Sequence, residues 1–269
     1  MGVLEAFVLG VVQGLTEFLP ISSSGHLELV PRVFGWERGG GVASRAFDVA
    51  LHFGTLCAVV AYFRMDLSRY VAAGIRQVMP GRQRSSDGRL GWLLILSAVP
   101  ASVIGVVAGS FIDDRLGTPT AIGWSLILFG VVLAIADRAV GARSIESTGI
   151  RDATLIGCAQ ILALNPGTSR SGVTMSAGRA IGLSRDAAVR FSFLMGVPVI
   201  FGAFLYEMAR LVRDGVPDGF VVPMVVGALT AGLVGWLAIA GIMTFVRTKS
   251  FTPFVVYRIV LGVVVLLAS

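Results

Sequence analysis

Two polar passages interrupt an otherwise apolar chain. Their sequences are TEFLPISSSGH at residues 16–26 and NPGTSRSGVT at residues 165–174, and long apolar runs flank both. A charged side chain at the centre of a hydrocarbon layer costs roughly 2.5 to 3.5 kcal/mol on insertion scales. Because these passages place a carboxylate, an imidazole and a guanidinium among apolar segments, they indicate chemistry or transport.

The composition favours a membrane protein. Of the 269 residues, 55% are hydrophobic and 14% are charged, whereas an ordinary soluble domain carries about 25% charged residues. The formal net charge of +6 comes mainly from arginines in short segments between apolar runs. This pattern is typical of membrane topology and not of nucleic-acid binding. We therefore expect one membrane domain and no nucleic-acid partner.

Six stretches are long and apolar enough to cross a bilayer. They are residues 46–63, 91–112, 119–136, 191–209, 220–245 and 252–268. Residues 2–35 and 152–182 are apolar at their ends but are broken by Pro20 or Pro166 together with Ser and Gly. Because non-helical backbone at membrane depth needs protein or a wet cavity to supply its hydrogen bonds, both are predicted to be re-entrant. The predicted fold is an all-α integral membrane protein with six transmembrane helices plus two re-entrant helix pairs.

The order of these elements suggests an internal repeat: one break and three spans, then one break and three spans. The shared positions are Gln13, Pro20 and Gly25 in the first half and Gln160, Pro166 and Gly172 in the second. The outer two pairs are offset by 147 residues (160 − 13 and 172 − 25). Since three spans is an odd number, the second half enters the membrane upside down. Residues 1–139 and 150–269 are therefore predicted to form inverted repeats whose breaks meet near the midplane.

The loops predict an orientation. One segment carries Arg64, Arg69, Arg76, Arg82, Arg84 and Arg89, and the segments on the same side carry Arg138, Arg143, Arg151, Arg185, Arg247 and Lys249. The opposite side holds Asp113, Asp114 and a nearly balanced loop with Arg210, Arg213, Asp214 and Asp218. The arginine-rich side is expected to be cytoplasmic, which places both termini outside.

The first break contains candidate metal and catalytic groups. Gln13 and Glu17 are four residues apart and share a helix face, where a carboxylate beside an amide oxygen makes a modest site for a hard cation. The alternative for this pair is a local cap or hydrogen bond of Glu17. Ser22, Ser23 and Ser24 can begin a helix that binds an anion. His26 follows within possible reach of a hydroxyl, the pairing that activates an oxygen nucleophile; its alternative is a satisfied core histidine.

The second break has the composition of a phosphate cradle. Arg170 lies between Ser169 and Ser171, with Thr168 and Thr174 close by and Gly167 and Gly172 giving backbone freedom. A guanidinium offers forked donors that suit phosphate. We expect phosphate binding here in preference to an ordinary serine-rich turn.

Two further polar residues lie in predicted spans. Arg258 could brace the fold against Asp48 or Glu207, or add positive potential to the site. His52, one turn after Asp48, is either a hydrogen-bonded packing residue or a residue of the same cavity. A structural role is favoured for both.

These motifs are similar to those of a known family. Gln13 and Glu17, followed by the run through Pro20 and Ser23 to His26, resemble its first motif, and Pro-Gly-x-Ser-Arg-Ser-x-x-Thr is complete at Pro166–Thr174. The chain thus resembles, nearly end to end, the undecaprenyl-diphosphate phosphatases of the bacitracin-resistance type. The resemblance implies a multi-pass enzyme of the bacterial plasma membrane that removes the terminal phosphate from a polyprenyl diphosphate. It also implies a role in recycling the lipid carrier of peptidoglycan synthesis and a divalent cation, Mg²⁺ or Ca²⁺.

The resemblance also implies roles for individual residues. Glu17 would bind the metal or orient the attacking group, with Gln13 assisting, and Arg170 would clamp the diphosphate. His26 would be a base or nucleophile and Ser23 a nucleophile or phosphate ligand, so the attacking atom stays open between these two and water. Substrate contacts are expected from Gln13, Ser22, Ser24, Gly167, Thr168, Ser169, Ser171 and Thr174.

Two other classes of function compete with hydrolysis. Inverted repeats with broken helices are also the architecture of secondary transporters, so a lipid-carrier flippase or transporter is the chief alternative. A membrane scaffold leaves the buried polar groups unexplained. The combination of Glu17, Ser23, His26 and Arg170 favours hydrolysis.

Overall fold

The computed structural model describes residues 1–36, 41–79, 85–215 and 219–269, and within them the side chains except those of 109–115 and 214. These residues form helices and no regular strand, which confirms the predicted all-α class. The α-helices are α1 Val3–Phe18, α2 Ser23–Phe34, α3 Gly41–Tyr62, α4 Arg64–Gln77, α5 Ser86–Leu116, α6 Pro119–Asp137, α7 Ile150–Ile161, α8 Arg170–Ala180, α9 Arg185–Asp214, α10 Val221–Phe245 and α11 Thr252–Ala268. Two short 3₁₀ helices, η1 Ile145–Ser147 and η2 Leu162–Leu164, complete the order.

All six stretches predicted to cross a membrane lie in helices. Five of these helices, α3, α5, α6, α9 and α10, contain windows that are long and apolar enough to span a bilayer by length and composition. The sixth, α11, is apolar but has 17 residues. The described part of the chain is therefore typical of a multi-pass membrane protein.

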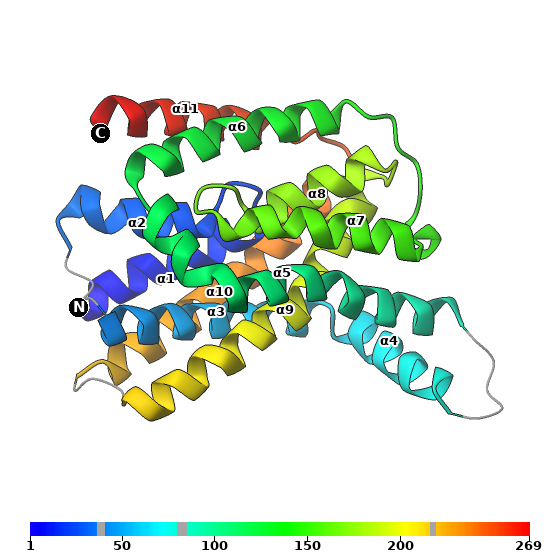
Figure 1. The fold of residues 1–269 in the computed structure, drawn as a ribbon, viewed down its shortest axis with the longest axis horizontal. Coiled ribbons are helices and arrows are strands. Elements are labelled where there is room, and N and C mark those ends of the chain that lie inside the picture. Colours follow the sequence, from blue (N-terminus) through cyan, green and yellow to red (C-terminus); the bar gives the residue numbers. More distant parts are fainter. Residues whose placement is uncertain (37–40, 80–84, 216–218) are drawn as a thin grey trace.

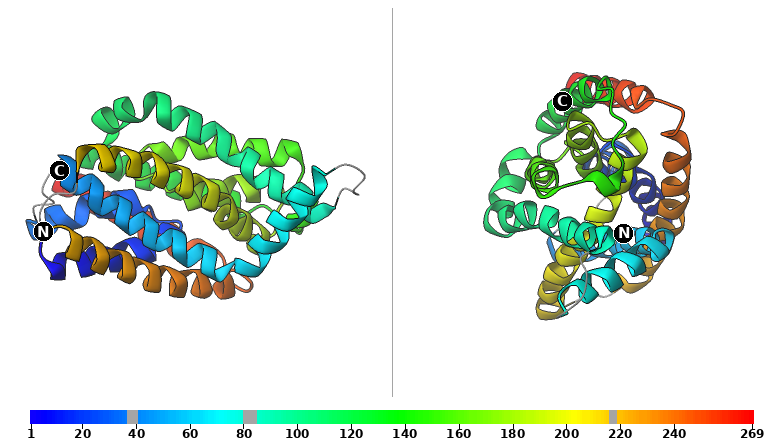
Figure 2. Two further views of the ribbon diagram at one scale, coloured as in Figure 1. Left: turned by 90° about the horizontal axis from the view of Figure 1, so that it is seen from below. Right: turned by 90° about the vertical axis from the view of Figure 1, so that its right-hand side faces the viewer.

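The two broken segments form hairpins of short helices. The α1–α2 hairpin enters the bundle from one end and the α7–α8 hairpin from the other, and both turn near the middle of the long axis (Figure 1). The N- and C-termini lie at the same end of the molecule (Figure 2). The packing is reciprocal, because α1 packs on α10 while α7 packs on α5, and the remaining long helices pair as α3 with α9 and α6 with α11.

The hairpins begin alike. Gly2 precedes α1 and its N–H donates to the Glu5 carboxylate at 2.7 Å, and Gly149 precedes α7 and donates to the Asp152 carboxylate at 3.0 Å. Both pairs keep the offset of 147 residues (149 − 2 and 152 − 5). An acid in the first turn satisfies a free N–H group and suits the positive end of the helix dipole. The echo between the halves thus extends beyond the polar breaks.

The hairpins also approach their neighbours at matching glycines. A Cβ on Gly10 would lie 2.8 Å from the Gly227 carbonyl oxygen on α10, and a Cβ on Gly157 would lie 2.5 Å from the Ser97 carbonyl oxygen on α5. Gly10 and Gly157 are again 147 residues apart (157 − 10). Small residues allow helix backbones to pack this closely. Each hairpin is therefore seated on a long helix of the other half.

Ion pairs gather the arginine-rich segments at one end. Arg185 donates to Asp137 at 2.6 Å, and Arg190 donates to Asp66 at 2.8 Å. The segment expected to link two spans after residue 64 contains the helix α4, whose first turn supplies Asp66. Arg82, Arg84 and Asp218, and the side chains of Asp113, Asp114 and Asp214, lie outside the described residues.

Arg258 joins the two hairpin turns. It is fully buried on α11, and its guanidinium donates to Pro20 O at 3.0 Å and to the carbonyl oxygens of Gly167 and Thr168 at 2.9 Å each. It also donates to Leu126 O of α6 at 3.2 Å. The rigid fork of donors suits several carbonyls at once. The structural role is confirmed, but the expected partners Asp48 and Glu207 are wrong, because the backbone breaks expose carbonyls that need these donors.

We expect Arg258→Leu to lower the free energy of unfolding by roughly 3 kcal/mol or more, because several buried carbonyls would lose their donors. Thermal unfolding of the purified protein in detergent measures the change. Arg32→Leu is the matched control, since Arg32 lies at the surface of α2 in an i,i+4 pair with Glu28 and is expected to contribute less than about 1 kcal/mol. Equal melting temperatures for the two variants would contradict the bracing role.

Candidate active site

The two hairpin turns touch each other. Ser171 Oγ donates to Leu19 O at 2.9 Å, and a Cβ on Gly25 would lie 3.6 Å from Gly167 Cα. Leu19 and Gly25 belong to the first break, and Gly167 and Ser171 belong to the second. The predicted meeting of the two breaks is confirmed.

Each turn ends in a serine that caps the next helix. Ser22 caps α2 with φ 77° and accepts from Gly25 N, and Ser169 caps α8 with φ 74° and accepts from Gly172 N. Positive φ is uncommon for a residue other than glycine and costs energy. The two caps keep the offset of 147 residues (169 − 22). They bring the N-termini of α2 and α8, with their free N–H groups, to the centre of the molecule.

The first residue of each capped helix binds one carboxylate. Ser23 begins α2 and its Oγ donates to Glu17 Oε2 at 2.7 Å, while Arg170 begins α8 and its Nη2 donates to Glu17 Oε1 at 3.1 Å. Arg170 Nη1 also donates to Ser192 O at 3.1 Å. Glu17 is 7% exposed, and a charge this buried needs such partners. Helices α1, α2 and α8 thus join acid, hydroxyl and guanidinium in one cluster.

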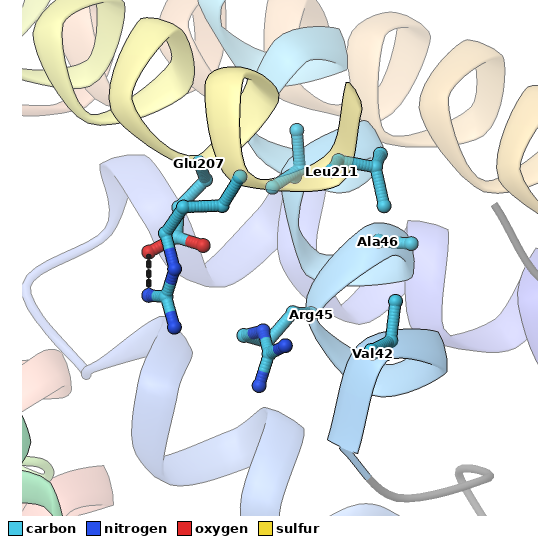
Figure 3. A pocket seen from close by; sticks show the side chains of 7 residues that line it. Val42, Arg45, Ala46, Glu207 and Leu211 are labelled. Atoms are coloured by element: carbon cyan, nitrogen blue, oxygen red, sulfur yellow. Dashed lines mark hydrogen bonds and ion pairs between the residues drawn. The ribbon is translucent and has the colours of Figure 1, made fainter. Parts of the chain in front are cut away.

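A cavity of about 450 Å³ opens onto this cluster. Its polar wall consists of Thr16, Glu17, Ser22, Ser23, Ser24, Ser169 and Arg170, and its apolar wall includes Val199, Ile200, Ala203 and Phe204 of α9. The far end of the cavity is lined by Arg45, Asp48, Glu207 and Arg210. Figure 3 shows a smaller pocket beside this end, where Arg210 pairs with Glu207 at 2.9 Å and Arg45 extends from α3. The cavity therefore suits a ligand with a charged head and an apolar tail.

Residues 6–264 match the family described as Bacitracin resistance protein BacA. The chain belongs to this family. It is 41% identical to the undecaprenyl-diphosphatase of Trichlorobacter lovleyi over 98% of this chain and 96% of the relative. It is 44% identical to that of Desulforudis audaxviator over 100% and 98%. It is 45% identical to that of Thermomicrobium roseum over 99% and 98%. The resemblance seen in the motifs is confirmed.

In this BacA-family chain, His26 does not line the cavity. Its Nδ1 donates to Ser22 O at 2.7 Å, and its Nε2 accepts from the Tyr257 hydroxyl at 2.7 Å. We assign these roles because a carbonyl oxygen can only accept. The two rings also stack, with centroids 5.7 Å apart. The hydroxyl that His26 contacts belongs to Tyr257, whereas the Ser23 hydroxyl donates to Glu17.

Gln13 also lies behind the cavity of the BacA-family site. Its side chain is fully buried, and its Nε2 donates to Glu17 Oε2 at 3.3 Å. Its Oε1 has no hydrogen-bond partner within the described part of the chain. Its amide thus orients Glu17, and it does not reach the cavity as the predicted cation ligand would.

Four other predicted contacts support the second turn. Gly167 has φ 90°, and Thr168 is fully buried. Thr174 Oγ1 donates to Arg170 O at 2.7 Å, and Ser171 binds the first turn. None of these four side chains or backbones lines the described cavity. Thr174 thus binds the Arg170 backbone directly. Ser22, Ser24 and Ser169, by contrast, do face the cavity.

Sequence reasoning missed part of the BacA-family cavity wall. Arg45 and Asp48 of α3 line it, as do Glu207 and Arg210 of α9. His52 of α3 also lines it, which agrees with one of the two alternatives stated for that residue. Their spacing of three and four residues places each set on one helix face. This periodicity of polar groups within apolar spans is the signal that could have found them.

We expect Ser169→Ala to lower the free energy of unfolding by about 1 kcal/mol, because the cap of α8 loses its acceptor. Ser169→Gly should cost less, because glycine adopts the positive φ without steric penalty. Thermal unfolding of both variants checks the order. A glycine variant less stable than the alanine variant would contradict the strain at this turn.

Proposed function

We propose that this protein hydrolyses undecaprenyl diphosphate to the monophosphate and inorganic phosphate, and so recycles the lipid carrier of cell-wall synthesis. The observation that carries the proposal is the contact of Glu17 with both Ser23 and Arg170. These three residues line a cavity that has one polar wall and one apolar wall. The name undecaprenyl-diphosphatase, carried by relatives that align over nearly the whole chain, supports it.

The cavity walls match the two parts of such a substrate. The polyprenyl chain lies along the apolar wall of α9, where Ile200 and Phe204 face the cavity. The diphosphate lies against Arg170 and the N-termini of α2 and α8, because a guanidinium and free helix N–H groups both bind phosphate oxygens. Ser22 and Ser24 add hydroxyl donors on the same wall. The head is thus bound at the centre of the bundle, and the tail leaves between helices.

In this proposal Glu17 takes the proton of the attacking hydroxyl. Ser23 Oγ already donates to its carboxylate at 2.7 Å, and a nucleophilic hydroxyl needs such an adjacent base. The hydroxyl belongs to a water, which gives inorganic phosphate directly, or to Ser23. If Ser23 attacks, the product is a phosphoserine, which a water then hydrolyses to release inorganic phosphate. As the bond between the terminal phosphorus and the bridging oxygen breaks, Arg170 stabilises the charge that moves onto the phosphate oxygens.

His26 is assigned a positioning role. Both ring nitrogens are bound, to Ser22 O and to Tyr257, so the ring holds the strained turn that presents Ser23. This assignment replaces the base or nucleophile expected from the motif. Tyr257 of α11 fixes the tautomer in which Nδ1 carries the proton.

The membrane layout we propose has six spans and two re-entrant hairpins in inverted repeats, residues 1–139 and 150–269. Hairpins that enter from opposite ends and share their caps and glycine contacts support it. The arginine-rich end faces the cytoplasm of the bacterial plasma membrane, and both termini lie outside. Arg45 near the start of α3 and Arg210 near the end of α9 line the far part of the cavity, so the site opens toward the outer face.

A divalent cation, Mg²⁺ or Ca²⁺, fits this site only if phosphate oxygens supply most of its ligands. Among the described residues, no three His, Cys, Asp or Glu side chains gather as a preformed cage. Of the predicted pair, Glu17 is the residue that would contact the ion, since Gln13 is buried and does not line the cavity. Hard cations bound through one carboxylate and substrate phosphates are common. When bound, the ion would neutralise phosphate charge.

Phosphate release from undecaprenyl diphosphate by the purified protein in detergent tests the function. Because no gradient exists there, release identifies hydrolysis and not transport. We expect Arg170→Ala to reduce release by 100-fold or more, on the order of the loss when one charge-stabilising donor is removed. Size-exclusion chromatography checks that the variant is folded. Near-normal turnover would remove Arg170 from the site.

Gly196→Ala tests the position of Arg170 without changing its chemistry. A Cβ on Gly196 would collide with the Arg170 guanidinium, whereas a Cβ on Gly202 of the same helix would meet nothing within 4 Å. Phosphate release should therefore fall at least about tenfold in Gly196→Ala, because misplaced catalytic groups lose rate steeply. Gly202→Ala should keep the wild-type rate. Equal rates for the two variants would contradict the placement.

Chelation tests the cation. We expect EDTA to suppress phosphate release and added Mg²⁺ or Ca²⁺ to restore it, because the diphosphate charge is otherwise poorly compensated beside Glu17. The same assay measures it. Full activity in EDTA would remove the cation from the proposal.

A further inference from the structure

His52 of α3 faces the same cavity as Glu17 and Arg170. It is partly buried and lines the cavity together with these two residues. Its Nδ1 donates to Asp48 O at 2.8 Å. The other ring nitrogen, Nε2, has no hydrogen-bond partner among the residues that the structure describes. One imidazole edge is thus anchored to its own helix, and the other remains available.

The charged side chains around the cavity do not by themselves compensate the charge of a bound diphosphate. Arg170 is paired with Glu17, and Arg210 is paired with Glu207, while Arg45 and Asp48 add one charge of each sign to the wall. A diphosphate brings at least two negative charges, and burying them without compensation is costly. Behind His52, α3 packs on α10, which carries no ionisable residue. The compensation must therefore come from groups that face the cavity.

We propose that His52 Nε2 binds a phosphate oxygen opposite Arg170, which makes His52 a substrate-binding residue of the hydrolysis proposed above. In the doubly protonated ring Nε2 donates to a phosphate oxygen, and in the neutral ring it accepts from a protonated one. The anchor at Asp48 holds the ring so that little freedom is lost on binding. The diphosphate is thus bound by Arg170 of α8 on one wall and by His52 of α3 on the other.

Two variants separate this role from packing. Glutamine at position 52 keeps a group that both donates and accepts, whereas leucine fills similar space without either. The matched control is Cys57→Ser, since Cys57 is exposed on α3 and does not line the cavity. Two readouts are used: KM and kcat for undecaprenyl diphosphate, and the Kd of inorganic pyrophosphate measured by calorimetry.

We expect His52→Leu to raise KM and the pyrophosphate Kd by roughly 10-fold or more, the effect of losing a hydrogen bond to a charged group. His52→Gln should stay within about threefold of wild type, and Cys57→Ser should match it. A raised KM with an unchanged pyrophosphate Kd would mean that His52 binds only the lipid-linked diphosphate. A parallel rise would mean that it also holds the free anion. Either supports binding at His52.

Other outcomes would overturn the inference. An unchanged KM and Kd in His52→Leu would exclude His52 from binding, and so would a loss in which glutamine behaves like leucine. The calorimetry keeps the test separate from the proposed function. If wild type releases no phosphate, the hydrolase proposal fails and KM is not measured. A pyrophosphate Kd raised by His52→Leu but not by His52→Gln then supports binding at His52, and an unchanged Kd overturns it.

Discussion

The buried guanidinium of Arg258 is the interaction on which the site depends. Two backbone breaks in the middle of an apolar bundle leave carbonyl groups without helical partners, and water is scarce there. Arg258 donates to Pro20 O in one turn and to the oxygens of Gly167 and Thr168 in the other. One side chain thus supplies hydrogen-bond donors to carbonyl oxygens of both turns and fixes the distance between them. The N-termini of α2 and α8 can then face one carboxylate.

The partners of Glu17 stabilise its buried carboxylate, and they are also groups that can bind a phosphate. Its carboxylate is buried by three helices, and Arg170 and Ser23 supply the charge and hydrogen bond that make this tolerable. The same partners are those that a phosphate needs. In the mechanism proposed above, Arg170 exchanges a carboxylate oxygen for phosphate oxygens when the head group binds, while Glu17 retains the Ser23 hydroxyl. The ion pair of the free protein thereby prepares the binding site.

The two histidines differ in what surrounds their Nε2 atoms. His26 follows the serines directly, so its sequence position favoured catalysis, yet its nitrogens bind Ser22 O and Tyr257. His52 lies in an ordinary apolar span, so its position favoured packing, yet it lines the cavity. Both rings bond a carbonyl four residues earlier with Nδ1. What differs is the surroundings of Nε2, which belong to other parts of the chain.

The sequence by itself determined the local features. Apolar length placed all six long helices, Pro20 and Pro166 marked the breaks, and the serines that follow them cap α2 and α8, because these effects act over a few residues. Tertiary structure alone decided which groups meet: Arg258 with the turn carbonyls, Tyr257 with His26, and His52 with the cavity. Those contacts join residues far apart in the chain, so their geometry depends on how the helices pack, which no local pattern encodes.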